Sequence, residues 1–169
     1  APVIDTTIFE YMRLLSANSY QKGAWVLHML KNELGDDLFW AGIRKYYDSY
    51  SNANALTSDF VKTMEEVADR DLAGFFYQWL FLPGHPQLKI SWSYDRARKE
   101  VNLLLEQIQE DHVFEFPLDI QINDTSGSRV ETVMVNRRAQ SFVLESVNSP
   151  GELIADPGVN LLFEEVGGE

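Results

Sequence analysis

The sequence predicts an α+β protein in which a helical part, residues 1–86, is followed by a small β-sandwich, residues 87–169. The first observation is a change of period: apolar side chains recur at helical spacing before Pro86 and at every second position after it. The second is punctuation, because turn-forming stretches such as NDTSG, NSPG and DPG divide the second part. Short strands at this spacing are typical of a sandwich.

The helical part is organised around the stretch 18–34, NSYQKGAWVLHMLKNEL. From Ala24 to Leu30 only His28 is not apolar, which predicts a helix buried on most of its sides. At its start, Asn18 and Gln21 have the spacing of a capping box. Gly35 is expected to end the helix in the left-handed conformation.

Two residues of this helix do not fit a plain core helix. Gly23 costs about 1 kcal/mol against alanine inside a helix, so we expect another part of the chain to approach the backbone there. Tyr20 lies in the first turn, where its hydroxyl can emerge into a cleft beside free backbone N–H groups.

The other helices follow from capping residues and apolar spacing. We expect one around 8–15, one beginning at Asp36, one beginning at Thr57 or Ser58, and one beginning at Asp71 and ending before Pro83. With the helix 18–34 they make five, packed antiparallel or nearly so. The core-facing positions are expected to be Phe9, Met12, Leu15, Phe39, Ile43, Tyr46, Tyr47, Tyr50, Phe60, Met64, Val67, Ala68, Leu72, Phe75, Phe76, Trp79 and Leu80.

The strands of the second part follow from alternating apolar residues. They are expected over residues 88–94, 101–108, 114–122, 130–135, 141–147, 153–155 and 159–166. Pro117 lies inside the third of them. Because proline cannot donate a ladder hydrogen bond, it indicates an edge strand or a bulge at that point.

The bulk composition excludes several classes of function. A chain of 169 residues that is 45% apolar can form one sizeable core or two small ones. Its net charge of −12 argues against nucleic acid or an anionic membrane surface as a partner. The sequence has no cysteine, hence no disulfides and no thiolate metal sites. No signal peptide is visible, and the run FFYQWLFL is too short to span a bilayer.

The string SYQKGAWVLHML resembles the Tyr-x-Lys-Gly-Ala helix of the aminopeptidase N family of zinc metallopeptidases, which includes the leukotriene hydrolases. LGDDLFWAGIRKYY, TSDFVKTMEEVADRDLAGFFYQWLFLPGHPQL and a strand ending in WSYD then follow in the family's order, so the resemblance covers roughly the whole chain. It implies the end of a thermolysin-like (gluzincin) catalytic domain, followed by a β-sandwich domain.

The resemblance also implies a catalytic role for Tyr20 and peptide substrates for an intact parent enzyme. In the family, the matching tyrosine donates a hydrogen bond to the oxyanion of the tetrahedral intermediate formed when an N-terminal peptide bond is hydrolysed. Lys22 and Gly23 accompany this tyrosine in the motif. Lys22 is expected to be structural or exposed, and Gly23 to be a packing contact.

One departure from the family concerns its metal. The family binds zinc through H-E-x-x-H and a glutamate of the next helix, both before the tyrosine helix, and this chain has no H-E-x-x-H. His28, His85 and His112 lie on different elements without metal-ligand spacing, and we expect His28 to be a core histidine. The family's Gly-x-Met-Glu-Asn strand is missing too. Zinc is therefore expected in the parent enzyme and not in this chain, which alone would be inactive.

Two other functions stay open. The chain can act as a non-catalytic scaffold or interaction module, or as a hydrolase that uses its own carboxylates, among them Glu65 and Glu66. A solvated helix face is the simpler explanation of these two, although the resemblance implies that one of them joins helices. We also expect self-association through an exposed helical face near Tyr20 and Trp25. Similarity to exported bacterial peptidases suggests a periplasmic or extracellular bacterial location.

Overall fold

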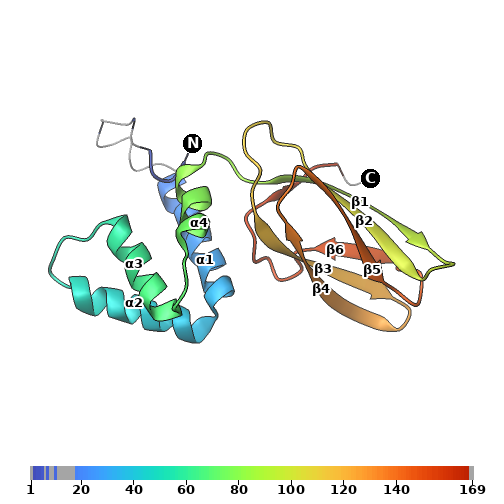
Figure 1. Cartoon of the computed structure of the whole chain (residues 1–169), viewed down its shortest axis with the longest axis horizontal. Coiled ribbons are helices and arrows are strands. Elements are labelled where there is room, and N and C mark those ends of the chain that lie inside the picture. The colour runs from blue at the N-terminus through green and yellow to red at the C-terminus, as the bar shows by residue number, and fades with distance from the viewer. Residues whose placement is uncertain (1, 6, 8–9, 11–17, 168–169) are drawn as a thin grey trace. The chain divides into compact units, whose positions relative to one another are not determined.

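The computed structural model of the chain describes residues 2–5, 7, 10 and 18–167. The chain divides into two compact units, Ala1–Gly84 and His85–Glu169 (Figure 1). The first unit is helical and the second consists of strands, so the predicted α+β class is confirmed. The helix expected around 8–15 lies outside the described residues. None of the helices in the described part is long and apolar enough to cross a membrane.

The helical unit contains two π-helical segments besides its α-helices. The stretch expected to form one helix from Asn18 begins as a π-helical turn and continues as an α-helix, and the last expected helix changes from α to π after one turn. The elements are η2 (Asn18–Lys22), α1 (Gly23–Leu34), α2 (Asp36–Tyr50), α3 (Thr57–Ala68), α4 (Ala73–Phe76) and η3 (Tyr77–Phe81).

Helix α1 is buried on one face, whereas the sequence predicted burial on most sides. Val26, Met29 and Leu30 are buried, but Leu27 is 42% exposed and His28 is exposed as well. Within its unit α1 packs against α2 and η3, and these neighbours cover a single face. An apolar sequence permits burial on most sides but does not supply the elements that would cover it, and the uncovered side of α1 is the exposed helical face expected from the sequence.

Both ends of α1 differ from the expected caps. Gly35 has the predicted positive φ of 79°, but its ψ of 164° is extended and not left-handed helical, and its N–H donates to the Lys31 carbonyl over 2.8 Å. At the other end the helix continues without a break from η2. The side chain of Asn18 is outside the described part, so the capping box of Asn18 and Gln21 stays a prediction.

An aromatic line joins α2, α3 and α4. The rings of Tyr46 and Phe60 meet edge to face at 5.2 Å, and those of Phe60 and Phe76 at 6.0 Å. Phe39, Met64 and the other buried residues complete the core of this unit as the helical spacing predicts. Tyr47 is an exception, since it is 69% exposed on the outer side of α2.

Helix α3 begins at Thr57, one of the two expected starts, but its cap is neither Thr57 nor Ser58. Its N-cap is Leu56, whose N–H donates to Oδ2 of Asp59 over 2.8 Å. Asp59 thus supplies the returning half of a capping box, and its negative charge suits the first turn of a helix.

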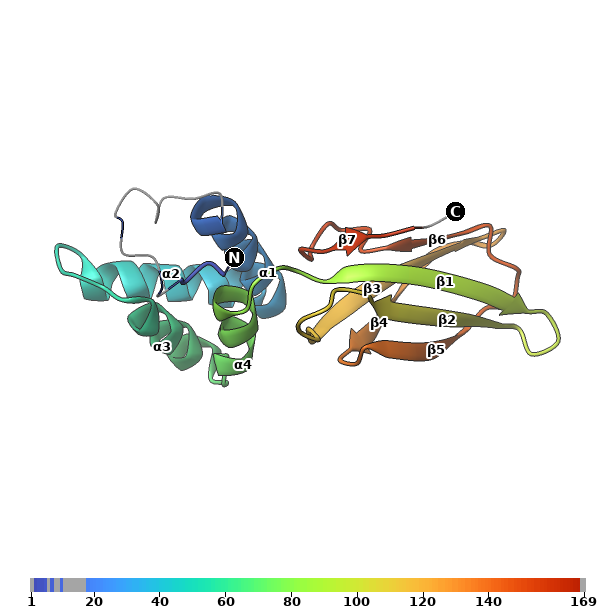
Figure 2. The ribbon, with the colours of Figure 1, turned by 90° about the horizontal axis from the view of Figure 1, so that it is seen from above.

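The second unit is a two-layer β-sandwich with seven strands in the described residues (Figure 2). One sheet has the order β5-β2-β1-β7 and the other β4-β3-β6. The strands are β1 (Gln87–Asp95), β2 (Glu100–Gln107), β3 (Phe116–Asp124), β4 (Gly127–Val135), β5 (Ala139–Glu145), β6 (Glu152–Ala155) and β7 (Glu164–Glu165).

Alternation along the strands places the core between the two sheets, as the period of two predicts. The inward residues of the central strands are almost fully buried: Val101, Leu103 and Leu105 on β2, and Phe116, Leu118, Ile120 and Ile122 on β3. In β1 the pattern weakens along the strand, because Leu88 is buried while Trp92 is 38% exposed.

Pro117 lies in β3, which is the central strand of its sheet and not the edge strand that the proline indicated. At Pro117 itself, however, β3 is paired on one side only. Strand β6 pairs with β3 only from Ile120 to Asn123, so at Pro117 the described ladder continues on the β4 side alone, where Pro117 lies opposite Met134. The missing N–H of the proline therefore interrupts no pairing with β6.

The last strand is much shorter than the expected 159–166. The Asp156 carboxylate accepts hydrogen bonds from the N–H groups of Asn160 and Leu161, over 2.8 and 2.9 Å, and Val159 has a φ of 54°. These contacts form a turn, so that only Glu164 and Glu165 pair, in parallel, with the start of β1.

Candidate functional site

Tyr20 lies on the surface of the helical unit, at the place where α1 begins. It belongs to η2, and 63% of its side chain is exposed. A π-helical turn accommodates one more residue per hydrogen-bonded ring than an α-helical turn, and such turns are frequent at functional sites. The exposed phenol is available to donate a hydrogen bond to a bound group.

Lys22, two residues later, has the opposite environment. Its side chain is only 7% exposed, and its Nζ donates to the Leu82 carbonyl over 2.8 Å. Burial lowers the pKa of this amine from its ordinary value. Of the two roles expected for Lys22, structural or exposed, the structure shows the structural one.

Gly23 has a neighbour, although not a close one. A Cβ built on Gly23 would lie 3.9 Å from Cγ1 of Val3, which is ordinary van der Waals contact. The expected packing contact is therefore present, but an alanine would fit, so the close approach inferred from the cost of glycine is not observed.

The histidines do not come together. His28 is exposed on α1, in edge-to-face contact with Trp25 at 5.4 Å and 3.2 Å from the Asn32 amide, so the prediction of a core histidine was wrong. His85 and His112 belong to the other unit, where His85 lies 3.6 Å from Glu164 and His112 accepts a hydrogen bond from Gln109 on its carbonyl.

The fit of a metal can be tested on the side chains themselves. Among the described residues, no group of three or more histidine, aspartate and glutamate side chains could hold a metal ion. Because structural and catalytic zinc sites take three or four such ligands, the described part of the chain does not fit zinc.

Glu65 and Glu66 join helices, as the family resemblance implied for one of them. Glu65 accepts a hydrogen bond from the Leu72 N–H over 3.0 Å, which connects α3 to the residue before α4. Glu66 pairs with Lys45 of α2 at 2.8 Å, and this contact lowers the pKa of its carboxyl. Both carboxylates are engaged in packing the helices, which accounts for them without catalysis.

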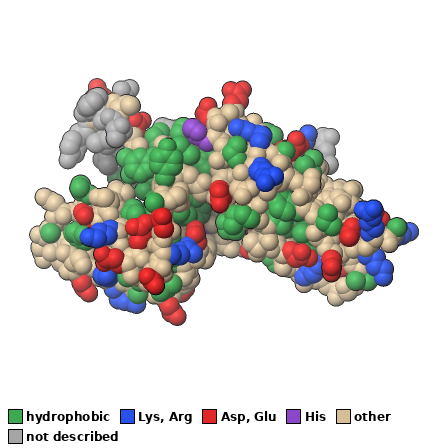
Figure 3. Space-filling model, viewed as in Figure 1, with side chains coloured by type: hydrophobic (Ala, Val, Ile, Leu, Met, Phe, Trp, Pro, Cys, Tyr) green, Lys and Arg blue, Asp and Glu red, His purple; other side chains and the backbone are tan. Residues whose placement is uncertain are grey.

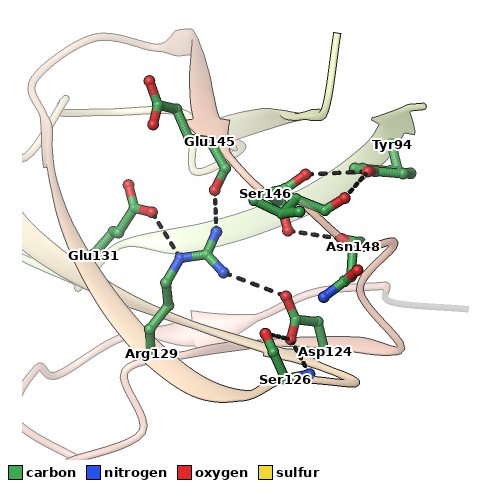
Figure 4. A network of polar contacts seen from close by, with 9 residues as sticks. Tyr94, Asp124, Ser126, Arg129, Glu131, Glu145, Ser146 and Asn148 are labelled. Carbon is green, nitrogen blue, oxygen red and sulfur yellow. Dashed lines mark hydrogen bonds and ion pairs between the residues drawn. The ribbon is translucent and has the colours of Figure 1, made fainter. Parts of the chain in front are cut away.

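Sequence reasoning did not predict a polar network at one end of the sandwich (Figure 4). Arg129 of β4 donates to the Glu145 carbonyl of β5, to Glu131 over 3.2 Å, and lies 3.8 Å from the Asp124 carboxylate. The residues border a hollow of about 540 Å³. The only hint of this network in the sequence was the turn-forming stretch Asp124–Gly127. It predicts the hairpin, but it does not predict that Arg129 reaches across to the other sheet.

A second hollow of about 430 Å³ opens between the sheets beside β1 and β6. It is lined by apolar residues such as Trp92, Ile120 and Leu153, together with Lys89 and Glu165. Elsewhere the charges are dispersed: on the face viewed in Figure 3, lysine and arginine lie among aspartate and glutamate rather than in one basic patch. This agrees with a chain of net charge −12.

The helical region matches a known family. Residues 6–79 match the model described as the peptidase family M1 domain. Leucyl aminopeptidase of Saccharolobus solfataricus is 28% identical over 132 residues, which cover 75% of this chain and 16% of that protein. Aminopeptidase N of Lactococcus lactis is 32% identical over 123 residues, covering 69% and 14% respectively.

Other similarities extend over more of the chain. Aminopeptidase N of Escherichia coli is 23% identical over 163 residues, which cover 86% of this chain and 19% of that protein. In fold, the chain is similar to the crystal structure of Legionella pneumophila aminopeptidase A in complex with aspartic acid, with a TM-score of 0.80 and 16% identity over 96% of this chain and 19% of that one.

The chain thus spans less than a fifth of the length of these relatives. The match of the helical region and the aminopeptidase relatives confirm the resemblance read from the Tyr-x-Lys-Gly-Ala helix: this chain belongs to the peptidase M1 family.

Proposed function

We propose that this chain is part of a zinc-dependent aminopeptidase that hydrolyses N-terminal peptide bonds, and that Tyr20 is the catalytic residue it supplies. The observation that carries the proposal is the exposure of Tyr20, 63%, at the start of α1 and inside the region that matches family M1. The aminopeptidases among its relatives make peptides the expected substrates.

The Tyr20 hydroxyl would act on the oxyanion that develops when the peptide carbonyl is attacked. A phenol that donates a hydrogen bond about 3 Å from that oxygen stabilises the transition state more than the ground state, and losing one such donor costs on the order of 10²–10³ in rate. Zinc supplies a Lewis acid in such chemistry. Because the described residues do not fit zinc, its ligands are expected outside this chain.

The decisive experiment is Tyr20→Phe in a longer protein that joins this chain to a zinc-binding region. We expect kcat to fall by about 10²–10³ with little change in KM, because the lost hydrogen bond belongs to the transition state. Tyr47→Phe, which removes a hydroxyl of similar exposure from α2, is the matched control and should keep full activity. A Tyr20→Phe enzyme with near-normal kcat would remove Tyr20 from the mechanism.

The chain alone is proposed to be inactive and to bind no stoichiometric zinc. Two measurements test this: the hydrolysis of chromogenic amino-acid amides by the isolated chain, and its metal content after dialysis. One tightly held zinc ion per chain, or turnover of the amides, would contradict the proposal.

The alternative function, an interaction module without catalysis, is supported by the uncovered side of α1. Leu27 is 42% exposed, and Ala24 and Tyr20 are exposed about one and two turns before it. Apolar stripes of this kind commonly mark association surfaces. We propose self-association through this face in the isolated chain. The periplasmic or extracellular location stays a prediction.

A further inference from the structure

Lys22 is an unusual residue at the position it holds. It stands where η2 passes into α1, with helical backbone angles of φ −66° and ψ −37°, and it is 7% exposed. Removing an ammonium group from water is costly unless hydrogen bonds replace the lost hydration, and burial accordingly lowers the pKa of Lys22. A sequence that needed only packing here would have an apolar residue.

The contact that compensates for this burial lies far away in the chain. Nζ of Lys22 donates over 2.8 Å to the carbonyl of Leu82, 60 residues later. Leu82 follows η3 directly and is itself followed by Pro83, so its carbonyl lies at a helix end, where carbonyls lack partners within the helix. The charged donor makes this hydrogen bond stronger than one between neutral groups.

The hydrogen bond between Lys22 and the Leu82 carbonyl, called the Lys22–Leu82 tie below, determines how the π-helical turn is rotated. Residues two apart on a helix point to different sides, and here Lys22 points into the unit while Tyr20 is 63% exposed. With the Lys22 side chain fixed to the carbonyl beyond η3, rotation of η2 about its axis would break the hydrogen bond. The direction of the Tyr20 ring therefore depends on the Lys22–Leu82 contact.

We propose that Lys22 is a positioning residue for Tyr20, which holds the π-helical turn in place through its hydrogen bond to the Leu82 carbonyl. The effect on local structure stands on the contact alone, while its consequence for catalysis rests on the proposed function. In an active protein, Lys22 touches neither substrate nor the reacting atoms and acts only through Tyr20.

The local effect is tested on this chain by amide hydrogen exchange. Lys22→Met keeps the apolar stem and removes the donor. The loss of one hydrogen bond of about 1.4 kcal/mol corresponds to a factor of about ten, so we expect amide exchange of residues 19–26 to accelerate about tenfold. The amides of α2 and α3 should exchange as in the unchanged chain. Lys22→Arg, which restores a charged donor, should recover part of the protection. Lys31→Met removes a half-exposed lysine at the other end of α1, where it pairs with Asp36 at 3.1 Å, and should leave the exchange of residues 19–26 unchanged.

If Lys22→Met does not fold, Pro83→Gly tests the same tie from its other end, because it loosens the segment that holds the Leu82 carbonyl. Faster exchange of residues 19–26 in Pro83→Gly supports the proposal. Unchanged exchange in whichever of the two variants folds overturns it.

The catalytic consequence is measured in the longer zinc-binding protein, where Lys22→Met should lower kcat about tenfold at nearly constant KM and Lys22→Arg should restore part of it. A normal kcat in Lys22→Met together with an impaired Tyr20→Phe would overturn the positioning role and leave the function of Tyr20 standing. If instead Tyr20→Phe is fully active while exchange in Lys22→Met is faster, the tie to the turn is real and the proposed function fails.

Discussion

Met64 of α3 lies directly against the backbone of Gly42 in α2. A Cβ built on Gly42 would stand 2.4 Å from Sδ and 2.8 Å from Cε of Met64, well inside van der Waals contact. Both residues are buried, and Met64 has no exposed surface. The two helices are therefore held together at a point where the absence of a side chain on one makes room for the side chain of the other.

Gly42→Ala should destabilise the helical unit by up to about 2 kcal/mol. Alanine gains about 1 kcal/mol of helix propensity, but the overpacking of a buried methionine costs about 1–3 kcal/mol and the Met64 side chain has little room to move. Urea unfolding followed by circular dichroism gives the loss. In a double-mutant cycle, Met64→Ala should make the same substitution favourable.

Gly74→Ala is the matched control for that experiment. Gly74 lies in α4, and a Cβ built there would meet nothing within 4 Å. Alanine should therefore be neutral or stabilising at this position. An equally large loss in Gly74→Ala would show that the cost at Gly42 does not come from Met64.

Gln107→Leu should destabilise the sandwich by about 3 kcal/mol. Gln107 is 1% exposed, and its amide both accepts from the Phe114 N–H, over 2.9 Å, and donates to the Phe114 carbonyl, over 2.8 Å. Leucine leaves both backbone groups buried without this partner, at about 1–3 kcal/mol each. The denaturation midpoint measures the loss. Gln121→Leu, on the outward side of β3, should change stability by about 0.5 kcal/mol or less.

Asp124 should make the sandwich sensitive to acid. Hydrogen bonds from Ser126, above all, hold the pKa of this carboxyl below its ordinary 3.8. A carboxyl with a lowered pKa in the folded state stabilises that state above its unfolded pKa, and the contribution disappears as the pH falls through the folded value. The advantage of the unchanged chain over Asp124→Asn should thus be complete at pH 7 and decline below about pH 4.

Urea unfolding of both proteins at a series of pH values checks this. Asp111→Asn, which removes an exposed carboxylate of the same sandwich, is the control for the loss of one negative charge. If the Asp124→Asn difference is the same at pH 7 and pH 3, the charge of Asp124 is not what stabilises the hairpin.

Self-association should be weakened by Leu27→Glu. The substitution places a charge in the middle of the exposed apolar side of α1, and because Leu27 is 42% exposed the fold should tolerate it. Sedimentation over a range of concentrations should show the unchanged chain associating and the variant remaining monomeric. Val143→Glu changes an apolar residue of the sandwich strand β5 that is 59% exposed; it is the control and should associate like the unchanged chain. A strict monomer at every concentration would contradict the proposed surface.

The sequence predicted those features that depend on neighbours in the chain. The change of period at Pro86, the strands around Leu103 and Ile120, and the place of Tyr20 at a helix start all follow from local spacing. What it did not predict depends on distant contacts. The π-helical form of η2 occurs together with a hydrogen bond between Lys22 and Leu82. These residues are 60 positions apart, so no local sequence pattern could predict their contact.

The same distinction explains the errors about burial. Leu27 is as apolar as Met29 and His28 lies between them, but which of the three faces the core is decided by where α2 and η3 pack. Likewise Arg129 has the sequence context of an ordinary strand residue, and only the packing of the two sheets, with β4 in one and β5 in the other, brings it to the Glu145 carbonyl. Periodicity indicates a face, whereas packing selects it.

The parallel pairing of β1 with β7 has a consequence for the order in which the sandwich forms. It brings Gln87 beside Glu164, 77 residues later, so the first and last strands of the unit can pair only once the chain between them has been synthesised. Contacts of such long sequence separation slow folding, because a long loop must close before they form. During synthesis on the ribosome, the helical unit can complete its local contacts while the outer edge of β1 still waits for the final residues of the sandwich to emerge.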